Sequence, residues 1–467
     1  MGSGTDIMRK WVAVGCTVLA LGAIWTGTAW YTGKQLETGM AQLAENAAGQ
    51  ARLIGAKLGH SFSPLIHSRL ADYDYQLVEL PDEADARAFF ARRDFRGVNV
   101  TIPYQKLALE ACDEVDPSAA AIGAVNTVVN RGGRLVGYNT DYDGFAYTAR
   151  RRGISFRDRV VLVLGTGGTS GTVAAVARDA GAKQVLFASR TGKNGALTYE
   201  QAAGRADVDL IVNASPAGMY PDTTACLADP GRYPRLAGVL DVIYNPLHTA
   251  LLQRAEALGV PCSNGLPMLV AQAKYAAERF TQSPIPDARI EDIYREVKAD
   301  RANLVLVGMP SCGKSSLGKA CAKSLGKPYV DLDEQLEQRA GRPIGDILRP
   351  GDEKPFRDLE SQVTADFARE GGQVLSTGGG VVLRPENVAA LRQNGVVVFV
   401  DRPLADLVPG GGRPLSQTRE ALAAQYAARL PLYQAACHAR VENTGDFYAV
   451  AKAIEEAFYE VLRSERA

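Results

Sequence analysis

Residues 160–171 read VVLVLGTGGTSG, and this stretch decides the fold of the first half of the chain. A fully apolar run, Val160–Leu164, leads directly into a glycine-rich loop, and a helical pattern follows over 172–180. A strand, a glycine turn and a helix N-terminus together form a cradle for a pyrophosphate. We therefore predict a dinucleotide-binding loop, although a serine stands where the third glycine is usual. Its candidate residues are Gly165, Gly167, Gly168, Thr169 and Ser170.

The end of the next predicted strand indicates which dinucleotide is bound. Residues 188–191 read ASRT, so no acidic residue is available there to hold a ribose 2′-hydroxyl. Arg190, with Ser189 and Thr191 beside it and Lys193 nearby, suits the 2′-phosphate of NADP instead. A surface arginine after an ordinary strand is the alternative.

A second nucleotide motif lies further along the chain. Residues 304–315 read LVLVGMPSCGKS, a complete Gly-x4-Gly-Lys-Ser loop between a predicted strand and a predicted helix. Backbone amides of such a loop wrap phosphates, the lysine reaches the β- and γ-phosphates, and the serine binds Mg²⁺. We predict an ATP–Mg²⁺ site at Gly308, Gly313, Lys314, Ser315 and Ser316, with Ser315 as a metal ligand.

Around both motifs, short β-branched runs alternate with longer amphipathic stretches, which is typical of α/β folding. Predicted strands are 160–164, 184–188, 209–213, 239–242, 304–307 and 396–400, with helices over 172–180 and 250–258. We expect a leader 1–50, a first nucleotide-binding unit 51–285, a linker 286–301 and a second nucleotide-binding unit 302–467.

The amino-acid composition argues against several classes of function. The 467 residues carry 52 Lys plus Arg and 52 Asp plus Glu, so nothing indicates a nucleic-acid partner. Seven scattered cysteines argue against a disulfide framework or a zinc site, and four histidines argue against a multi-histidine metal centre.

The N-terminus differs from the rest. Residues 11–31 contain no charge and are long enough to cross a bilayer as one hydrophobic helix, with Arg9 and Lys10 before them. A cleaved signal peptide is the main alternative, and a fusion or a misjoined reading frame is a third. The predicted location is cytoplasmic for the enzyme domains, with a membrane tether through 11–31 as an open alternative.

Residues 53–282 resemble the shikimate dehydrogenase family through seven motifs in the family's order. These are GHSFSP (59–64), NVTIP (99–103), GAVNT (123–127), YNTD (138–141), NASPAGM (213–219), DVIYNP (241–246) and NGLPMLVAQ (264–272). The resemblance implies that Met219 lies beside the nicotinamide. It implies that shikimate or 3-dehydroshikimate is held by Ser61, Ser63, Thr101, Asn126, Asp141, Tyr244 and Gln272.

The proton-transfer motif departs from the family pattern, in which a lysine follows Thr-x-Pro and one aromatic residue or histidine. Residues 101–106 read TIPYQK, so Gln105 takes the lysine position and Lys106 comes one place later. We expect Lys106 and Asp141 to handle the proton, with a solvated Lys106 as the alternative. His60 and His67 are expected to be structural.

Residues 301–467 resemble shikimate kinase through YVDLD (329–333), FRDLE (356–360), GGG (378–380), RPL (413–415) and RLPLY (429–433). The resemblance implies that Asp331 helps to hold Mg²⁺ and that Asp333 binds the reacting hydroxyl. It also implies carboxylate binding by Arg357 and Arg429, a lid arginine at Arg413, and close backbone approach at Gly378, Gly379 and Gly380. Residues 408–412 lack the further basic residue expected in the lid.

The two resemblances together imply a bifunctional enzyme with a substrate-binding subdomain 51–150, completed by about 266–285, a Rossmann NADP-binding subdomain 151–265 and a P-loop kinase domain 302–467. It would reduce 3-dehydroshikimate with NADPH and then phosphorylate shikimate with ATP. One alternative is an active kinase whose dehydrogenase half, impaired by Gln105, serves as a binding or scaffold module. A membrane-tethered binding protein without turnover is another.

Overall fold

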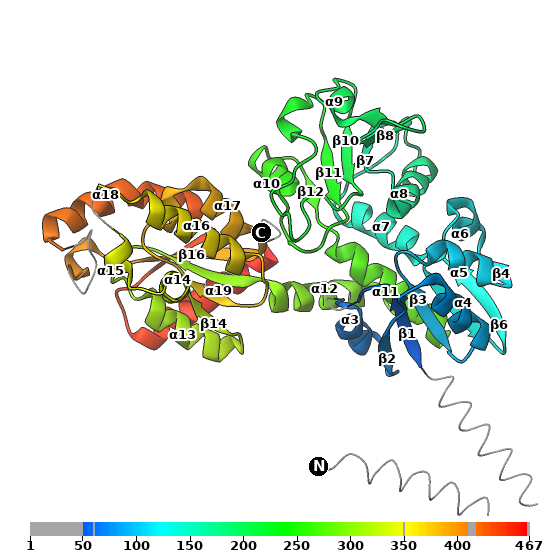
Figure 1. Cartoon of the computed structure of the whole chain (residues 1–467), viewed down its shortest axis with the longest axis horizontal. Helices are drawn as coiled ribbons and strands as arrows, with labels where there is room; N and C mark the ends of the chain where they lie inside the picture. The colour runs from blue at the N-terminus through cyan, green and yellow to red at the C-terminus, as the bar shows by residue number, and fades with distance from the viewer. Residues whose placement is uncertain (1–49, 59–60, 349–350, 410–416, 465–467) are drawn as a thin grey trace, which may run out of the picture.

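The computed structural model describes residues 50–58, 61–348, 351–409 and 417–464. In these residues three sheets are flanked by helices, as the α/β pattern predicted (Figure 1). The predicted leader helix at 11–31 lies outside the described residues. Within them, no helix combines the length and the apolar character needed to span a bilayer.

The first sheet is mixed and has the strand order β2-β1-β3-β5-β6-β4. Its strands are β1 (Ala51–Gly55), β2 (Tyr75–Glu79), β3 (Gly97–Val100), β4 (Glu114–Val115), β5 (Thr127–Arg131) and β6 (Arg134–Tyr138). The helices of this part are α3 (Ser63–Leu70), α4 (Glu83–Arg92), α5 (Gln105–Ala111), α6 (Pro117–Ile122) and α7 (Thr140–Arg151). Because β1 and β3 pair in parallel, the loops that follow them leave the sheet at the same edge.

The second sheet is parallel, with the order β12-β11-β10-β7-β8-β9. Its strands are β7 (Val160–Leu164), β8 (Gln184–Ser189), β9 (Leu197–Thr198), β10 (Leu210–Asn213), β11 (Gly238–Asp241) and β12 (Cys262–Ser263). The helical segments are α8 (Gly168–Asp179), α9 (Tyr199–Ala202), η1 (Pro230–Arg232), α10 (Ala250–Ala257) and α11 (Leu266–Thr281). All five residues of β7 are buried, as expected of a central parallel strand covered on both faces. Helix α11 returns to pack against α7 and α3 of the first part.

The predicted linker at 286–301 is largely a helix, α12 (Ala288–Arg301). Ile290, Ile293 and Val297 are fully buried along one face of α12, because that face packs against α3, α11 and α19. Figure 1 shows α12 running between the first two sheets and the third.

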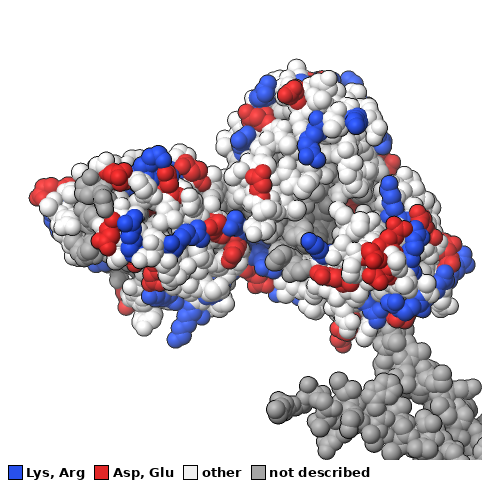
Figure 2. Space-filling model, viewed as in Figure 1, with Lys and Arg blue, Asp and Glu red and all other residues white. Residues whose placement is uncertain are grey.

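The third sheet is parallel, with the order β14-β15-β13-β16-β17. Its strands are β13 (Asn303–Val307), β14 (Tyr329–Asp331), β15 (Val374–Ser376), β16 (Gly395–Asp401) and β17 (Ala439–Glu442). Its α-helices are α13 (Lys314–Leu325), α14 (Leu332–Ala340), α15 (Ile344–Ile347), α16 (Lys354–Ala368), α17 (Pro385–Asn394), α18 (Arg419–Ala436) and α19 (Phe447–Arg463). Two short 3-10 segments complete this part, η2 (Val381–Leu383) and η3 (Leu404–Asp406). Figure 2 shows acidic and basic groups interspersed over the visible face, in keeping with the balanced composition.

Candidate active sites

A pocket of about 440 Å³ opens where β1 and β3 end and β5 begins, opposite α7 and α11. All seven residues predicted to hold the substrate line this pocket. They are Ser61, Ser63, Thr101, Asn126, Asp141, Tyr244 and Gln272. Thr169, at the start of α8, lines the same pocket, so the pocket is continuous with the predicted dinucleotide loop.

Asn126 and Asp141 form the centre of the pocket wall. The Asn126 side-chain oxygen accepts from the Thr140 backbone amide at 2.7 Å and from the Thr127 hydroxyl at 3.0 Å. This anchoring orients the Asn126 amide NH₂ toward Asp141. Burial raises the pKa of Asp141 to about 6, while hydrogen bonds from Asn126 and Gln105 act in the opposite direction. A carboxyl with a pKa in this range can exchange a proton near neutral pH.

Gln105, and not Lys106, faces this carboxylate. Helix α5 begins at Gln105, and successive residues of a helix point about 100° apart, so the two side chains leave in different directions. Gln105 lines the pocket and donates weakly to the Val100 carbonyl at 3.4 Å, whereas Lys106 is exposed and is not part of the pocket wall. The prediction that Lys106 acts with Asp141 is therefore not supported by this placement.

Gln105 also lies close to the dinucleotide loop. Its Oε1 is 3.4 Å from the point where a Cβ at Gly168 would stand. The Gln105 amide is therefore close to the loop that begins α8.

Lys57 is a pocket residue that the sequence prediction missed. It follows β1, its side chain is exposed, and it lines the pocket near Ser61. Because β1 pairs in parallel with β3, the segments that follow them, which carry Lys57 and Thr101, leave the sheet at the same edge. Its ammonium group adds positive charge to the wall that carries the two predicted carboxylate-binding serines.

His67 is structural, as predicted. It is fully buried, its ring stacks on Tyr75 with centroids 3.8 Å apart, and its Nδ1 lies 2.5 Å from the Tyr73 hydroxyl. Burial lowers the pKa of His67 to about 3, so the ring is neutral at physiological pH. His60 lies outside the described residues.

The dinucleotide loop has the geometry of a phosphate cradle. Gly165 has φ +107°, and a Cβ there would stand 3.0 Å from the Ala214 carbonyl, so glycine is required. At Gly167 a Cβ would meet nothing within 4 Å, which leaves open space for a ligand beside the α8 N-terminus. Ser170 replaces the usual third glycine and bonds through its hydroxyl to the Gly167 carbonyl.

The groups predicted to select NADP stand at the end of β8. Arg190 and Thr191 are exposed, and the Ser189 hydroxyl accepts from the Gly192 amide at 3.1 Å, which tightens the turn. Met219, predicted beside the nicotinamide, is 44% exposed and does not line the substrate pocket.

A second pocket, of about 970 Å³, covers the carboxyl edge of the third sheet. Eleven residues predicted for nucleotide, metal and substrate binding line it. They are Gly313, Lys314, Ser315, Ser316, Asp331, Asp333, Arg357, Gly378, Gly379, Gly380 and Arg429. Gly308 opens the loop with φ +151°, and a Cβ there would stand 2.5 Å from the Val400 carbonyl. Arg413 and residues 410–412 lie outside the described residues.

Ser315 and Asp331 meet at the predicted metal position. The Ser315 hydroxyl donates to Asp331 Oδ2 at 2.9 Å, and the Tyr329 hydroxyl donates to the same oxygen at 3.0 Å. A hydroxyl and a carboxylate side by side are the oxygen ligands that Mg²⁺ prefers, so this pair fits the ion. Lys314 is buried, and its ammonium donates to the Gly308 and Met309 carbonyls, each at 2.9 Å.

Asp333, the predicted binder of the reacting hydroxyl, lies in the first turn of α14. Its backbone amide donates to Asp331 Oδ1 at 3.1 Å, which fixes the start of α14. Burial, and next the Asp331 charge, raise the pKa of Asp333 to about 6, while the Lys314 charge acts in the opposite direction. The carboxyl is therefore mostly ionised at neutral pH but can take up a proton.

The three consecutive glycines make the substrate side of this pocket possible. A Cβ at Gly378 would stand 2.6 Å from Asp333 Oδ1, and one at Gly380 would stand 2.2 Å from Arg357 Nη1. A Cβ at Gly379 would stand 2.7 Å from Pro310 in the phosphate loop. Side chains at these positions would displace the groups predicted to bind substrate.

Two buried arginines face the same pocket. Arg357 is held by Glu360 at 2.8 Å and by Glu353 at 3.2 Å, and Arg429 donates to the Gly379 carbonyl at 3.0 Å. The sequence prediction missed the two glutamates as positioning groups. Their spacing from Arg357, three residues for Glu360 on α16 and four for Glu353 at its N-cap, was the available signal.

Fold and sites together define a chain with an oxidoreductase unit of the dinucleotide-binding class and a phosphotransferase domain of the P-loop class. The chain is 37% identical over 254 residues to the shikimate dehydrogenase (NADP(+)) of Caldicellulosiruptor bescii, covering 47% of this chain and 85% of that relative. It is 32% identical over 263 residues to that of Clostridium perfringens, covering 53% of this chain and 97% of that relative. The chain belongs to the shikimate dehydrogenase family.

Family models and a solved structure extend this result. Residues 53–128 match the shikimate dehydrogenase substrate binding domain, and residues 310–460 match shikimate kinase. The chain therefore carries both enzymes of a bifunctional shikimate-pathway protein. A chorismate mutase/shikimate 5-dehydrogenase fusion protein from Clostridium acetobutylicum aligns with a TM-score of 0.51 and 30% identity, covering 54% of this chain and 97% of that one. Residues 8–68 match the model of a bacterial protein of unknown function (DUF945).

Proposed function

We propose that this chain catalyses two consecutive reactions, the reduction of 3-dehydroshikimate to shikimate with NADPH and the phosphorylation of the shikimate 3-hydroxyl by ATP. One observation carries the proposal. Each nucleotide loop opens into a pocket whose other walls bear the hydroxyl, amide, carboxylate and guanidinium groups that a polyhydroxylated carboxylate requires. Use of both nucleotides favours a cytoplasmic location for these two units.

In the first reaction, bound NADPH supplies a hydride to the carbonyl carbon. The carbonyl oxygen then needs one proton, and Asp141 in its protonated form donates it and is reprotonated from solvent. Asn126 and Gln105 orient the Asp141 carboxyl, while Ser61 and Ser63 bind the substrate carboxylate.

In the second reaction, Asp333 accepts the proton of the hydroxyl that attacks the γ-phosphorus, and ADP leaves. Lys314 neutralises charge on the transferred group, and Arg357 with Arg429 grips the planar substrate carboxylate. Ser315 and Asp331 would hold Mg²⁺, whose charge stabilises the phosphate oxygens. Arg413 retains its proposed role as a lid arginine.

The exposed Lys106 favours a second candidate function, an active kinase whose dehydrogenase half binds ligands without efficient turnover. Glutamine donates hydrogen bonds but cannot carry a proton, so loss of a general acid–base group at position 105 slows the step by roughly 10²–10⁴-fold in comparable cases.

The two functions are separated by one assay on the full chain. Shikimate is mixed with NADP⁺ without ATP, and NADPH absorbance is followed before ATP is added. An NADP⁺-dependent rate, much larger than with NAD⁺, supports the bifunctional enzyme. No rate in a preparation that then phosphorylates shikimate supports the kinase with a silent dehydrogenase, and failure of both reactions would refute the proposal.

A further inference from the structure

Two consecutive residues at the end of α17, Gln393 and Asn394, reach from the kinase domain into the dehydrogenase unit. Both are buried, and α17 lies beside α10 of that unit (Figure 1). They are not among the described residues that line either active-site pocket. The two dehydrogenase segments that they bind, however, both leave the carboxyl edge of the second sheet, and ligands of parallel α/β sheets bind at that edge.

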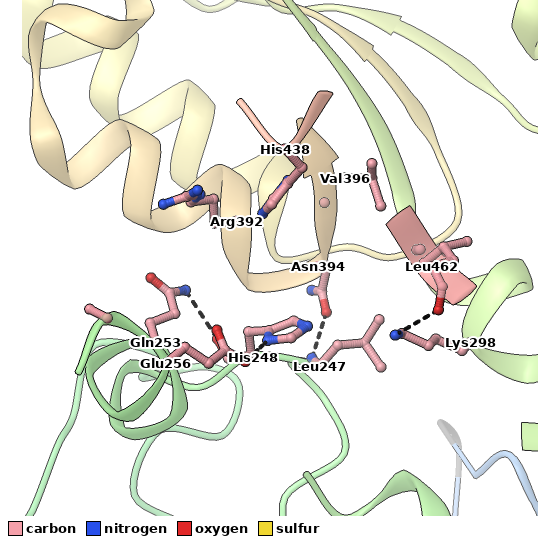
Figure 3. A pocket seen from close by; sticks show the side chains of 13 residues that line it. Leu247, His248, Gln253, Glu256, Lys298, Arg392, Asn394, Val396, His438 and Leu462 are labelled. Atoms are coloured by element: carbon pink, nitrogen blue, oxygen red, sulfur yellow. Dashed lines mark hydrogen bonds and ion pairs between the residues drawn. The ribbon is translucent and has the colours of Figure 1, made fainter. Parts of the chain in front are cut away.

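Asn394 holds the segment that follows β11. Its side-chain Oδ1 accepts from the Leu247 amide at 2.9 Å, and Figure 3 shows this pair joining the two units. The Leu247 carbonyl accepts in turn from Asn264 Nδ2 at 2.8 Å. Leu247 is therefore fixed between the kinase domain and the turn that begins α11, and it lies three residues after Tyr244 of the substrate pocket.

The turn that begins α11 connects Leu247 to a second wall of the substrate pocket. The Gly265 amide donates to the Ile243 carbonyl at 2.8 Å, so the start of α11 is bonded directly to the segment after β11. Tyr244 lines the pocket from that segment, and Gln272 lines it from α11. A shift of Leu247 would therefore displace two walls of the substrate pocket.

Gln393 holds a different segment, the loop that connects β10 to η1. Its Nε2 donates to the Thr223 carbonyl of this loop at 3.0 Å. A second kinase residue contacts the same loop, because the Arg369 guanidinium lies 5.3 Å from the centroid of the Tyr220 ring. The kinase domain thus holds this loop at two positions.

The loop between β10 and η1 borders the dinucleotide site. Because β10 pairs in parallel with β7, the loop leaves the sheet beside the glycine turn. Its base packs on that turn, since a Cβ at Gly165 would stand 3.0 Å from the Ala214 carbonyl. The loop then folds back on itself, since a Cβ at Gly218 would stand 3.1 Å from the Ala225 carbonyl. Residues 219–224 form its tip, and this tip is the part that the kinase domain holds.

We propose that the end of α17 is a positioning element of the dehydrogenase, in which Asn394 holds the walls of the substrate pocket and Gln393 holds the loop beside the dinucleotide site. This inference rests on the dehydrogenase function proposed above and deepens it, because it assigns part of the support of that site to the kinase domain. Each bond joins an amide N–H to an amide oxygen, and loss of one such bond changes an equilibrium constant by roughly three- to tenfold.

Steady-state kinetics of the full chain test the role of Asn394. Asn394→Ala should raise the KM for shikimate in NADP⁺ reduction by roughly three- to tenfold, with kcat within about twofold of wild type. Asn394→Asp keeps an acceptor oxygen for the Leu247 amide and should keep the wild-type KM. Asn303→Ala is the matched control and should also keep it. Asn303 donates to the Glu370 carbonyl at 2.7 Å within the kinase domain, much as Asn394 donates to the Arg369 carbonyl at 3.0 Å.

Nucleotide binding tests the role of Gln393 without requiring turnover. NADPH fluorescence is titrated with ADP–Mg²⁺ present to fill the kinase site. Gln393→Ala should raise the Kd of NADPH by roughly three- to tenfold and leave the KM for shikimate within about twofold of wild type. Asn394→Ala should show the reverse pattern, with the Kd of NADPH nearly unchanged. A kinase rate within about twofold of wild type shows that each variant is folded.

This crossed pattern separates positioning from a general loss of stability, which would raise both constants together. Both constants at wild-type values in both variants would overturn the proposal, and so would an equal rise in Asn303→Ala. A wild-type chain without dehydrogenase turnover would refute the proposed function alone. The Kd of NADPH in Gln393→Ala would then still decide whether α17 supports the dinucleotide site, and it also decides if Asn394→Ala does not fold.

Discussion

At the scale of single residues, dehydrogenase activity depends on which side chain faces Asp141. The structure places the Gln105 side chain in the same pocket wall as Asp141, whose pKa it lowers, while Lys106 is exposed. An amide in this position can orient a substrate oxygen but leaves Asp141 as the group that titrates.

The rate of shikimate oxidation should therefore depend on the ionisation of Asp141. In this direction the carboxylate accepts the substrate proton, so kcat should rise with pH through about 6, where the raised pKa of Asp141 lies. Reduction needs the protonated carboxyl and should fall with pH over the same range. Initial rates between pH 4.5 and 8 measure both profiles. Asp141→Asn should remove this inflection, and its persistence in that variant would exclude Asp141 as the proton carrier.

Restoring a lysine at position 105 should raise dehydrogenase turnover. In Gln105→Lys, the ammonium would replace an amide that already touches Asp141 and lies near Gly168, so it would reach both substrate and carboxylate. We expect a gain in kcat of at least about tenfold, from general acid–base catalysis. Lys106→Ala is the matched control and should change kcat little. A large loss in Lys106→Ala would show instead that the displaced lysine serves the reaction.

At the scale of elements, the glycine turn 378–380 sets the substrate side of the kinase pocket. Gly380→Ala should raise the KM for shikimate by at least about tenfold, because its Cβ would stand 2.2 Å from Arg357 Nη1 and displace a buried guanidinium. The KM for ATP should change much less. Gly445→Ala is the matched control, since a Cβ there meets nothing within 4 Å. An unchanged shikimate KM in Gly380→Ala would argue against Arg357 as a carboxylate ligand.

The sequence was most informative about the positions of the strands. Predicted strand 160–164 coincides with β7, and 184–188 and 304–307 each fall one residue short of β8 and β13. Long apolar runs between turns predict buried parallel strands well, because burial on both faces leaves little choice of residue.

The details of the sites depended on geometry that a linear pattern does not contain. Whether Gln105 or Lys106 faces the pocket depends on the residue at which α5 begins. Lys57 enters the pocket through the pairing of β1 with β3, and Glu360 is recognised only once Arg357 is seen on the buried face of α16. The residues around Asp141 and Asp333 were predictable from the sequence because each belongs to a short contiguous motif at the end of a strand.

At the scale of the whole molecule, two catalytic units share one chain and contact each other through α12 and the junction of α10 with α17. Their pockets have no wall residue in common. Lys314→Met should therefore lower kinase turnover by roughly 10²-fold or more, through loss of a phosphate-neutralising charge. Dehydrogenase turnover should stay within about twofold, because sites without shared partners behave independently. A parallel loss of both activities would show that the units are catalytically coupled.

The central claim is that one chain carries out both reactions. The full chain is incubated with 3-dehydroshikimate, NADPH and ATP–Mg²⁺, and NADPH oxidation and shikimate 3-phosphate are quantified together. We predict that phosphorylated product accumulates and that NADPH is consumed in equal molar amount. A different result would contradict the account: the chain phosphorylates added shikimate, but it consumes no NADPH when 3-dehydroshikimate is supplied.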